Sequence, residues 1–321
     1  MAFTSIDAWK SAMKAFAKHS NVSVADMQQR YILDEFASKI GESPYRDSLV
    51  LKGGFIVSNL LGIDSRTTKD IDMTFNSVIY DEKQIRSIME EIINVQNDTF
   101  FHFEIQSIKA GQVDDGHSGF MVTLNAIHDR TRLTMKLDIS NNTLIYPRAI
   151  QFSYQNAITG EPIGVMSYCV ENIIAEKFET TLDRGEYNTR MRDLFDIVML
   201  KDTQNHLIDP QTLSNCIVEV SKERGTMENL YHYDVLTDEL KGSPVFHKNF
   251  EQYKKRTYPR SDVTLQKVFR VFDEVYNDVK ALLPEREVKK DVLEEKIQSA
   301  GERAAHKKRK QMRLKQQGQD R

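Results

Sequence analysis

The sequence predicts an α+β fold, in which a mixed sheet with flanking helices is followed by an all-α domain. Between residues 48 and 166, several short segments alternate apolar and polar residues, which is the period of half-buried strands. From Ser167 onward the apolar residues recur at helical spacing instead. This change predicts a boundary near residue 160, with a sheet domain at 1–160, a helical domain at 161–283 and a charged helical tail at 284–321.

Composition indicates a cytoplasmic protein without a membrane segment. The 321 residues are 40% hydrophobic and 28% charged, which suffices for a substantial core. No apolar run reaches the length of a membrane span, and the N-terminus lacks the charged and apolar regions of a signal peptide. Cys169 and Cys216 are far apart in the sequence, so we expect buried thiols in a reducing cytoplasm rather than a disulfide or a metal site. The histidines show no zinc-ligand spacing.

The net charge of −3 hides an asymmetry along the chain. Residues 301–321 hold eight Lys and Arg against two acids, a net of +6, so the first 300 residues sum to −9. A basic tail on an acidic body is typical of a local contact with a polyanion such as RNA. A solvated helix end explains the same charges equally well.

Two helices are expected before the first strand. Residues 4–19 carry one apolar stripe at helical spacing. Ser23 is placed to cap a second helix, which must end before Pro44. We expect this pair to pack against the sheet.

The stretch 51–75 combines two short motifs. A strand at 48–51 leads into Gly53 and Gly54, an apolar helix ends near Gly62, and a second strand carries Asp70 and Asp72 on one face. Two neighbouring carboxylates favour a bound cation, and Mg²⁺ or Mn²⁺ is held by such acids together with substrate phosphates. A glycine pair at a helix N-terminus leaves room for a phosphate. Together the motifs predict phosphoryl or nucleotidyl transfer, although each alone would suit a solvated strand end or a tight turn.

The rest of the sheet is expected to supply a third acid. A helix at 81–95 precedes a strand at 101–108, a turn at 111–119 and a hairpin of strands at 120–127 and 133–139. Asp138 lies on the last of these strands among apolar residues, where a carboxylate is costly to bury unless it is paired or metal-bound. The alternative is an edge-strand acid paired with Lys136.

The second half of the chain is expected to be helical, with helices at 167–183, 189–203, 209–222 and 262–282. Asp262 is placed to cap the last of them. The segment 225–260 is less regular, and its aromatic residues alternate with Lys and Arg. Such a pattern suits either stacking on RNA or ordinary helix packing.

One combination of these residues resembles the signature of a known family. The pattern G-G, apolar helix, R-x-T-x-D-I-D is similar to that of the AbiEii/AbiGii nucleotidyltransferase-like toxins, a branch of the DNA polymerase β-type nucleotidyltransferase superfamily. Two later segments match further motifs of the family, E-x-x-x-x-E-K and R-D-x-x-D. The matching residues are Gly53, Gly54, Arg66, Thr68, Asp70, Asp72, Lys177, Arg192, Asp193 and Asp196. Gly54 departs from the superfamily pattern, which often has serine there.

The resemblance implies roles for these residues. Asp70, Asp72 and Asp138 would bind the metal, and Asp138 would complete a second metal site or accept a proton. The nucleotide site would be formed by Lys52, Gly53, Gly54, Arg66, Thr68, Lys177, Asp193 and Asp196. From spacing alone, Lys177, Asp193 and Asp196 would instead form salt bridges on a solvated helix face.

The resemblance also implies a biological role. The chain would be the toxin of a toxin–antitoxin or phage abortive-infection pair, controlled by a cognate antitoxin. It would transfer a nucleotide from a nucleoside triphosphate such as GTP or CTP to an RNA acceptor, with tRNA the expected one. The alternatives are a nucleotide-binding regulatory module without transfer activity and a nucleotidyltransferase that modifies a small molecule.

Overall fold

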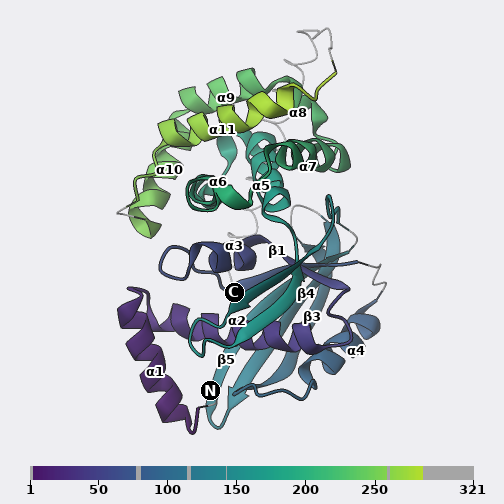
Figure 1. Cartoon of the computed structure of the whole chain (residues 1–321), viewed down its shortest axis with the longest axis vertical. Coiled ribbons are helices and arrows are strands. Elements are labelled where there is room, and N and C mark those ends of the chain that lie inside the picture. The colour runs from purple at the N-terminus through teal and green to yellow at the C-terminus, as the bar shows by residue number, and fades with distance from the viewer. Residues whose placement is uncertain (1–2, 77–80, 114–116, 142, 259–260, 285–321) are drawn as a thin grey trace, which may run out of the picture.

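The computed structural model describes residues 3–76, 81–113, 117–141, 143–258 and 261–284. A mixed sheet with its helices forms one part of the molecule, and the helices that follow the last strand form the other, drawn above the sheet in Figure 1. The α+β class predicted from the sequence is confirmed. None of the helices in the described residues is both long and apolar enough to cross a membrane.

Two helices precede the sheet, as predicted. They are α1 (Ile6–His19) and α2 (Val24–Glu42), and the Ser23 hydroxyl accepts a hydrogen bond from the Asp26 amide at the start of α2. Phe36 of α2 packs edge to face on Phe103 of the sheet, with ring centroids 5.3 Å apart. Helix α2 therefore covers one side of the sheet, as Figure 1 also shows, and α1 packs on α2.

Seven strands form the sheet, in the order β3-β4-β5-β2-β1-β7-β6. Their bounds are β1 (Leu49–Lys52), β2 (Asp70–Phe75), β3 (His102–Val113), β4 (His117–His128), β5 (Thr131–Asn141), β6 (Ile150–Gln155) and β7 (Pro162–Ser167). Strand β2 runs parallel to β5, and β1 runs parallel to β7, while the other pairs are antiparallel. Strands β1 and β2 therefore lie at the centre, joined by α3 (Gly53–Leu61). The helix α4 (Glu82–Ile93) follows β2 and is capped by Asp81.

The helical part begins after β7. It consists of α5 (Val170–Arg184), α6 (Met191–Thr203), α7 (Pro210–Glu223), α8 (Met227–Tyr231), α9 (Tyr233–Gly242), α10 (Pro244–Thr257) and α11 (Leu265–Lys280). Strand β7 pairs with the central β1, so the sheet extends past residue 160 to Ser167. The predicted tail at 284–321 lies outside the described residues beyond Pro284.

The segment 225–260 is more regular than the sequence suggested. It forms α8, α9 and α10, and Ser243 followed by Pro244 is a helix start that the sequence contained. Its aromatic rings pack on the helical core: the buried Phe250 and the partly exposed Tyr258 each stack on Phe195 of α6, with centroids 5.1 and 5.0 Å apart. These stacks are the helix packing that was one of the two interpretations of the segment.

Two local predictions need correction. Most of the turn expected at 111–119 is strand, because β3 continues to Val113 and β4 begins at His117. Residues 114–116 lie outside the described part of the chain. The N-cap of α11 is Thr264, whose hydroxyl accepts a hydrogen bond from the Lys267 amide. Asp262 instead forms an ion pair with the Lys267 ammonium at 2.8 Å.

Candidate active site

The glycine pair brings the start of α3 against the strand acids. Gly53 has a φ of +62°, and a Cβ atom there would lie 2.5 Å from the Asp72 Oδ2. A Cβ atom on Gly54 would lie 2.9 Å from Arg66 Nη2 and 3.1 Å from the Thr68 hydroxyl. A side chain at either position would collide with motif residues. The glycines are therefore required by close approach as well as by backbone conformation.

The three predicted acids share one face of the sheet. Asp72 is paired in register with Asp138 on the parallel strand β5, so their side chains project from the same side. Asp70 lies two residues earlier on that side, while Ile71 and Met73 are fully buried on the other. All three acids are partly exposed to solvent. The three acids therefore lie on one face of the sheet.

The register also places two lysines on this face. Lys52 lies opposite Asp72 on β1, and Lys136 lies opposite Asp70 on β5. Lys136 is exposed, so the sheet face next to the acids carries a solvated positive charge. The hydroxyl of Thr68 donates a hydrogen bond to Asp70 Oδ1 at 3.0 Å and so fixes the orientation of that carboxylate.

The donor set suits a hard divalent cation. Carboxylate oxygens are the ligands that Mg²⁺ and Mn²⁺ prefer, and Mg²⁺ in nucleotide sites is held by one or two carboxylates plus substrate phosphates. Among the described residues, no group of three or more His, Cys, Asp and Glu side chains lies in a metal-holding arrangement. The three acids thus do not form a ready-made cage, and a metal here would take part of its coordination from the nucleotide.

Behind the glycines, a buried ion-pair network joins the sheet to the helical part. Arg66 Nε donates to Asp196 Oδ1 at 2.9 Å, and Lys177 Nζ lies 2.9 Å from Asp196 Oδ2 and 2.6 Å from Asp193 Oδ1. Asp196 has no exposed side-chain surface, and Lys177 retains 11%. These residues come from the loop before β2, from α5 and from α6. The network therefore fixes α5 and α6 relative to Gly53 and Gly54, which form the glycine hinge between β1 and α3.

The network holds Asp196 and Lys177 in their charged forms. Burial alone would raise the pKa of Asp196, but Arg66 and Lys177 outweigh it and lower that pKa to about 2. Burial alone would lower the pKa of Lys177, but Asp193 and Asp196 raise it above its ordinary value. Asp196 is therefore the acid of the R-D-x-x-D motif that contacts the glycine-rich unit, since Asp193 reaches it only through Lys177.

A second network was missed by the sequence analysis. Lys52 Nζ lies 3.8 Å from Glu176 Oε1 on α5, and Arg224 at the end of α7 lies 3.5 Å from the same oxygen. Arg224 also pairs with Glu179 at 2.6 Å. Glu176 belongs to the E-K dipeptide of the matched motif, but Arg224 stands in no motif, so no sequence signal indicated it.

The predicted residues thus fall into two groups. The acids Asp70, Asp72 and Asp138 are accessible, whereas the cations Lys52, Arg66 and Lys177 are largely buried in ion pairs. A buried and paired cation must break its pair to touch a ligand, which costs free energy. In this conformation the three cations position the scaffold around the site. Arg192, which matches the same motif as Asp196, is exposed in the first turn of α6.

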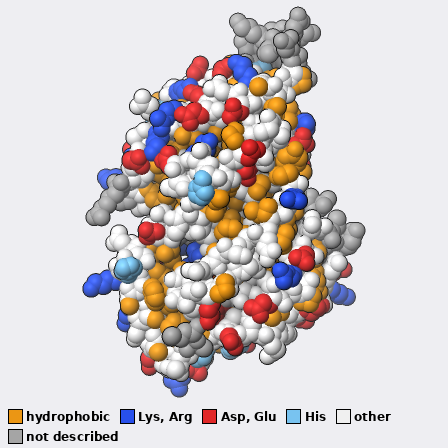
Figure 2. Space-filling model, in the orientation of Figure 1, with side chains coloured by type: hydrophobic (Ala, Val, Ile, Leu, Met, Phe, Trp, Pro, Cys, Tyr) orange, Lys and Arg blue, Asp and Glu red, His pale blue; other side chains and the backbone are white. Residues whose placement is uncertain are grey.

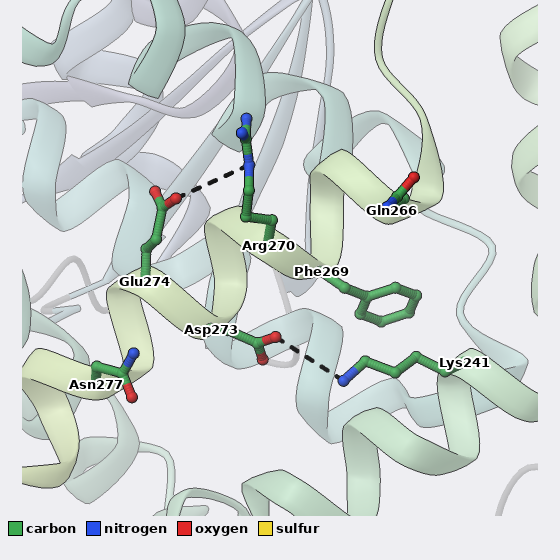
Figure 3. A pocket seen from close by; sticks show the side chains of 7 residues that line it. All are labelled: Lys241, Gln266, Phe269, Arg270, Asp273, Glu274 and Asn277. Atoms are coloured by element: carbon green, nitrogen blue, oxygen red, sulfur yellow. Dashed lines mark ion pairs between the residues drawn. The ribbon is translucent and has the colours of Figure 1, made fainter.

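One surface hollow lies away from the motif residues. A hollow of about 490 Å³ lies between α9 and α11, shown in Figure 3. Its charges are already paired, Lys241 with Asp273 and Arg270 with Glu274, each at 3.9 Å. It contains none of the motif residues, and we therefore assign the site to the sheet.

We expect Gly53→Ala to reduce activity far more than it reduces stability. The φ of +62° makes alanine strained, at about 1–2 kcal/mol, and its Cβ would displace the Asp72 carboxylate. A displacement of this size lowers turnover by about a hundredfold. Gly185→Ala is the matched control, because its φ is +54° and nothing lies within 4 Å of the added Cβ. Thermal melts and nucleotide-transfer assays of both variants test this; equal loss of turnover in the two would contradict it.

The fold and the site together define a class of protein. A strand, a glycine pair and a helix N-terminus that face acids on adjacent strands are the parts of a nucleotidyltransferase site. The sequence matches the family described as nucleotidyl transferase AbiEii toxin, Type IV toxin–antitoxin system, over residues 36–307, and the chain belongs to that family. The resemblance stated from the motifs is confirmed.

Three solved structures are similar to the chain at low identity. A candidate nucleotidyltransferase from H. pylori is 16% identical, with a TM-score of 0.43, and the match covers 82% of this chain and 100% of that chain. JHP933 from Helicobacter pylori is 17% identical, with a TM-score of 0.41 and coverage of 81% and 95%. An antigenic nucleotidyltransferase-like protein from Paracoccidioides brasiliensis is 16% identical, with a TM-score of 0.37 and coverage of 62% and 90%. No curated protein matches the sequence.

Proposed function

We propose that the chain is a metal-dependent toxin that transfers a nucleotide from a nucleoside triphosphate to an RNA acceptor. The observation that supports this most directly is the contact between Gly53 and Asp72, with Asp138 beside Asp72 on the next strand. It brings the N-terminus of α3, where unpaired amides attract phosphate, next to accessible acids. A protein that merely bound nucleotide would gain nothing from gathering negative charge there.

The reaction is an in-line attack by an acceptor hydroxyl on the α-phosphorus of the triphosphate. A new bond forms between the acceptor oxygen and phosphorus, the bond to the β-phosphate oxygen breaks, and pyrophosphate leaves. Asp138 accepts the hydroxyl proton, since it is partly exposed beside Asp72. The amides at the start of α3 hold the phosphates. Asp70 and Asp72 would hold Mg²⁺ or Mn²⁺, which neutralises charge on the phosphates and the leaving group.

The buried cations act in this proposal by positioning. Arg66 is paired with Asp196, and its guanidinium packs against Gly54. It therefore fixes the loop that leads into β2. Lys177 is bound by Asp193 and Asp196. Its partial exposure leaves an approach for a triphosphate, whose negative charge could replace one of the two aspartates as a partner.

An RNA acceptor, with tRNA the first to test, is supported by charges near the site. The last turn of α10 carries Lys255 and Arg256, both exposed, and Tyr258 just beyond it stacks on Phe195, the neighbour of Asp196. Lys136 adds a positive charge beside Asp70. Basic side chains of this kind bind the phosphate backbone. Elsewhere on the face drawn in Figure 2, acidic and basic side chains are interspersed.

The family assignment supports the biological setting. A Type IV toxin–antitoxin family implies a cognate antitoxin, and we propose that this chain is controlled by one in the cytoplasm, with arrest of a phage-infected cell as the outcome. GTP and CTP are the nucleotides to test first.

One labelling experiment separates this function from its alternatives. The protein is incubated with each α-³²P-labelled nucleoside triphosphate, Mg²⁺ and total RNA, and the products are resolved by size. We expect label in RNA, and no label when EDTA removes the metal. Bound nucleotide without transfer would indicate a regulatory module, and a labelled small molecule formed without RNA would indicate a small-molecule transferase. Either result would overturn the proposal.

A further inference from the structure

The two cysteines of the chain meet in the folded protein, although they are far apart in the sequence. Cys169 is the N-cap residue of α5, and Cys216 lies within α7. Both thiols donate to the same backbone carbonyl, that of Tyr146, with Sγ–O distances of 3.7 Å for Cys169 and 3.4 Å for Cys216. Both cysteines are buried free thiols, as expected, and the fold places them together at one oxygen.

The two sulfurs are chemically unequal. A hydrogen bond from the Cys216 thiol lowers the pKa of Cys169 and, by the same contact, raises the pKa of Cys216. Cys169 also stands at a helix N-terminus, where the unpaired amides favour a thiolate. Cys169 is therefore suited to act as the nucleophile and Cys216 as the thiol that resolves its oxidised form.

Access to the pair is restricted to one side. Cys169 is 8% exposed, whereas Cys216 has no exposed surface. A small uncharged oxidant can reach Cys169 from solution, while a bulky disulfide such as oxidised glutathione cannot reach Cys216. The first oxidation step thus falls on Cys169, with Cys216 beside it as the nearest thiol.

We propose that Cys169 and Cys216 form a site of reversible oxidation, at which a peroxide converts the two thiols into an intramolecular disulfide. The Cys169 thiolate attacks one peroxide oxygen, the O–O bond breaks, and sulfur becomes a sulfenic acid as the first water leaves. The Cys216 thiol then attacks that sulfur, the S–S bond forms, the S–O bond breaks, and a second water leaves. Two thiols lose two electrons and two protons, and hydrogen peroxide is reduced to two waters.

The disulfide would join the start of α5 to α7. Helix α5 carries Lys177 two turns further on, and Arg224 at the end of α7 contacts Glu176 of α5. The bond would therefore fix the two helices that support the buried cations. The site does not depend on the proposed transfer reaction, and its test needs no activity measurement.

The 321-residue chain offers a clean test, because its sequence contains two cysteines. The native protein is treated with hydrogen peroxide, catalase removes the excess, and N-ethylmaleimide is added under denaturing conditions before intact-mass analysis. We expect alkylated thiols to fall from two per chain to none, with the loss of two hydrogens, and dithiothreitol to restore both. Retention of both thiols, or disulfides between chains alone, would overturn the proposal.

Two serine variants identify the order of the steps. In Cys216→Ser the sulfenic acid on Cys169 has no resolving partner, so we expect it to persist and to be labelled by dimedone. In Cys169→Ser we expect Cys216 to remain a thiol over the period in which the wild type is fully oxidised. Oxidation of Cys216 at the wild-type rate in the second variant would show that Cys169 is not the nucleophile. The wild-type measurement decides the main question even if a variant fails to fold.

Discussion

Asp72→Asn is expected to lower nucleotide transfer by about a thousandfold while leaving the fold intact. Asp72 lies against the glycine hinge and beside Asp138, so it is the acid best placed to hold a metal and the phosphates together. Metal-ion stabilisation of a developing charge contributes several kcal/mol to the transition state, and each 1.36 kcal/mol is about tenfold in rate. Asparagine keeps the volume of the side chain and removes its charge. Transfer of label to RNA under saturating Mg²⁺ measures the effect.

Asp98→Asn is the control for this variant. Asp98 is exposed in the connection between α4 and β3. Its substitution by asparagine also removes one negative charge, but away from the site. We expect wild-type transfer from it. In a bacterium that expresses the chain without its antitoxin, the wild type and Asp98→Asn should arrest growth, and Asp72→Asn should not. Growth arrest by all three would count decisively against a catalytic role for Asp72.

Asp196→Asn is expected to destabilise the protein by about 3–5 kcal/mol at neutral pH. Asp196 is fully buried and is paired with both Arg66 and Lys177. Removal of one partner from a buried ion pair leaves the other charge uncompensated, which costs about this much. Chemical denaturation of the two proteins gives the difference in free energy of unfolding.

The same variant makes a prediction about acid. The pKa of Asp196 is lowered from 3.8 to about 2 in the folded protein. A depressed folded pKa contributes stability that is present above the unfolded pKa and is lost as the pH falls through the folded pKa. The stability difference between wild type and Asp196→Asn should therefore narrow between about pH 4 and pH 2. A difference that stays constant over this range would show that Asp196 is not held as a carboxylate by its partners.

Asp202→Asn provides the matched control on the same helix. Asp202 pairs with Lys267 at 2.7 Å, but its side chain is 38% exposed. Exposed ion pairs contribute roughly 0–1 kcal/mol, so this variant should unfold close to the wild type. An equal loss of stability in Asp196→Asn and Asp202→Asn would show that burial does not make the ion pairs of Asp196 more costly to break.

Much of the candidate site was accessible from local sequence. The alternation of Asp70, Ile71, Asp72 and Met73 specifies which side chains share a face, because the period of a strand is two. The helix start at Ser23 was equally readable, since capping is a contact within a few residues. The motif match linked these segments to a family, and the family assignment is confirmed.

Long-range pairing was not accessible in this way. Asp72 and Asp138 are brought together by strand register, Asp196 meets Arg66 across 130 positions, and Cys169 meets Cys216 at the carbonyl of a third segment. Nothing in the local spacing of these residues indicates their partners. Likewise, the sequence allowed the aromatic rings of α10 either to stack on RNA or to pack in the core. The stacking of Phe250 on Phe195 shows that this ring packs in the core.

The sequence by itself determined the α+β class, the glycine hinge, the face of the acids and the family. These depend on backbone periodicity and on short motifs, which are local properties. The tertiary structure decided that the motif cations are buried in ion pairs while the acids remain accessible. The tertiary structure also brings the two thiols together. The burial of the cations and the meeting of the thiols both depend on how the sheet and the helices pack against each other, which local sequence does not specify.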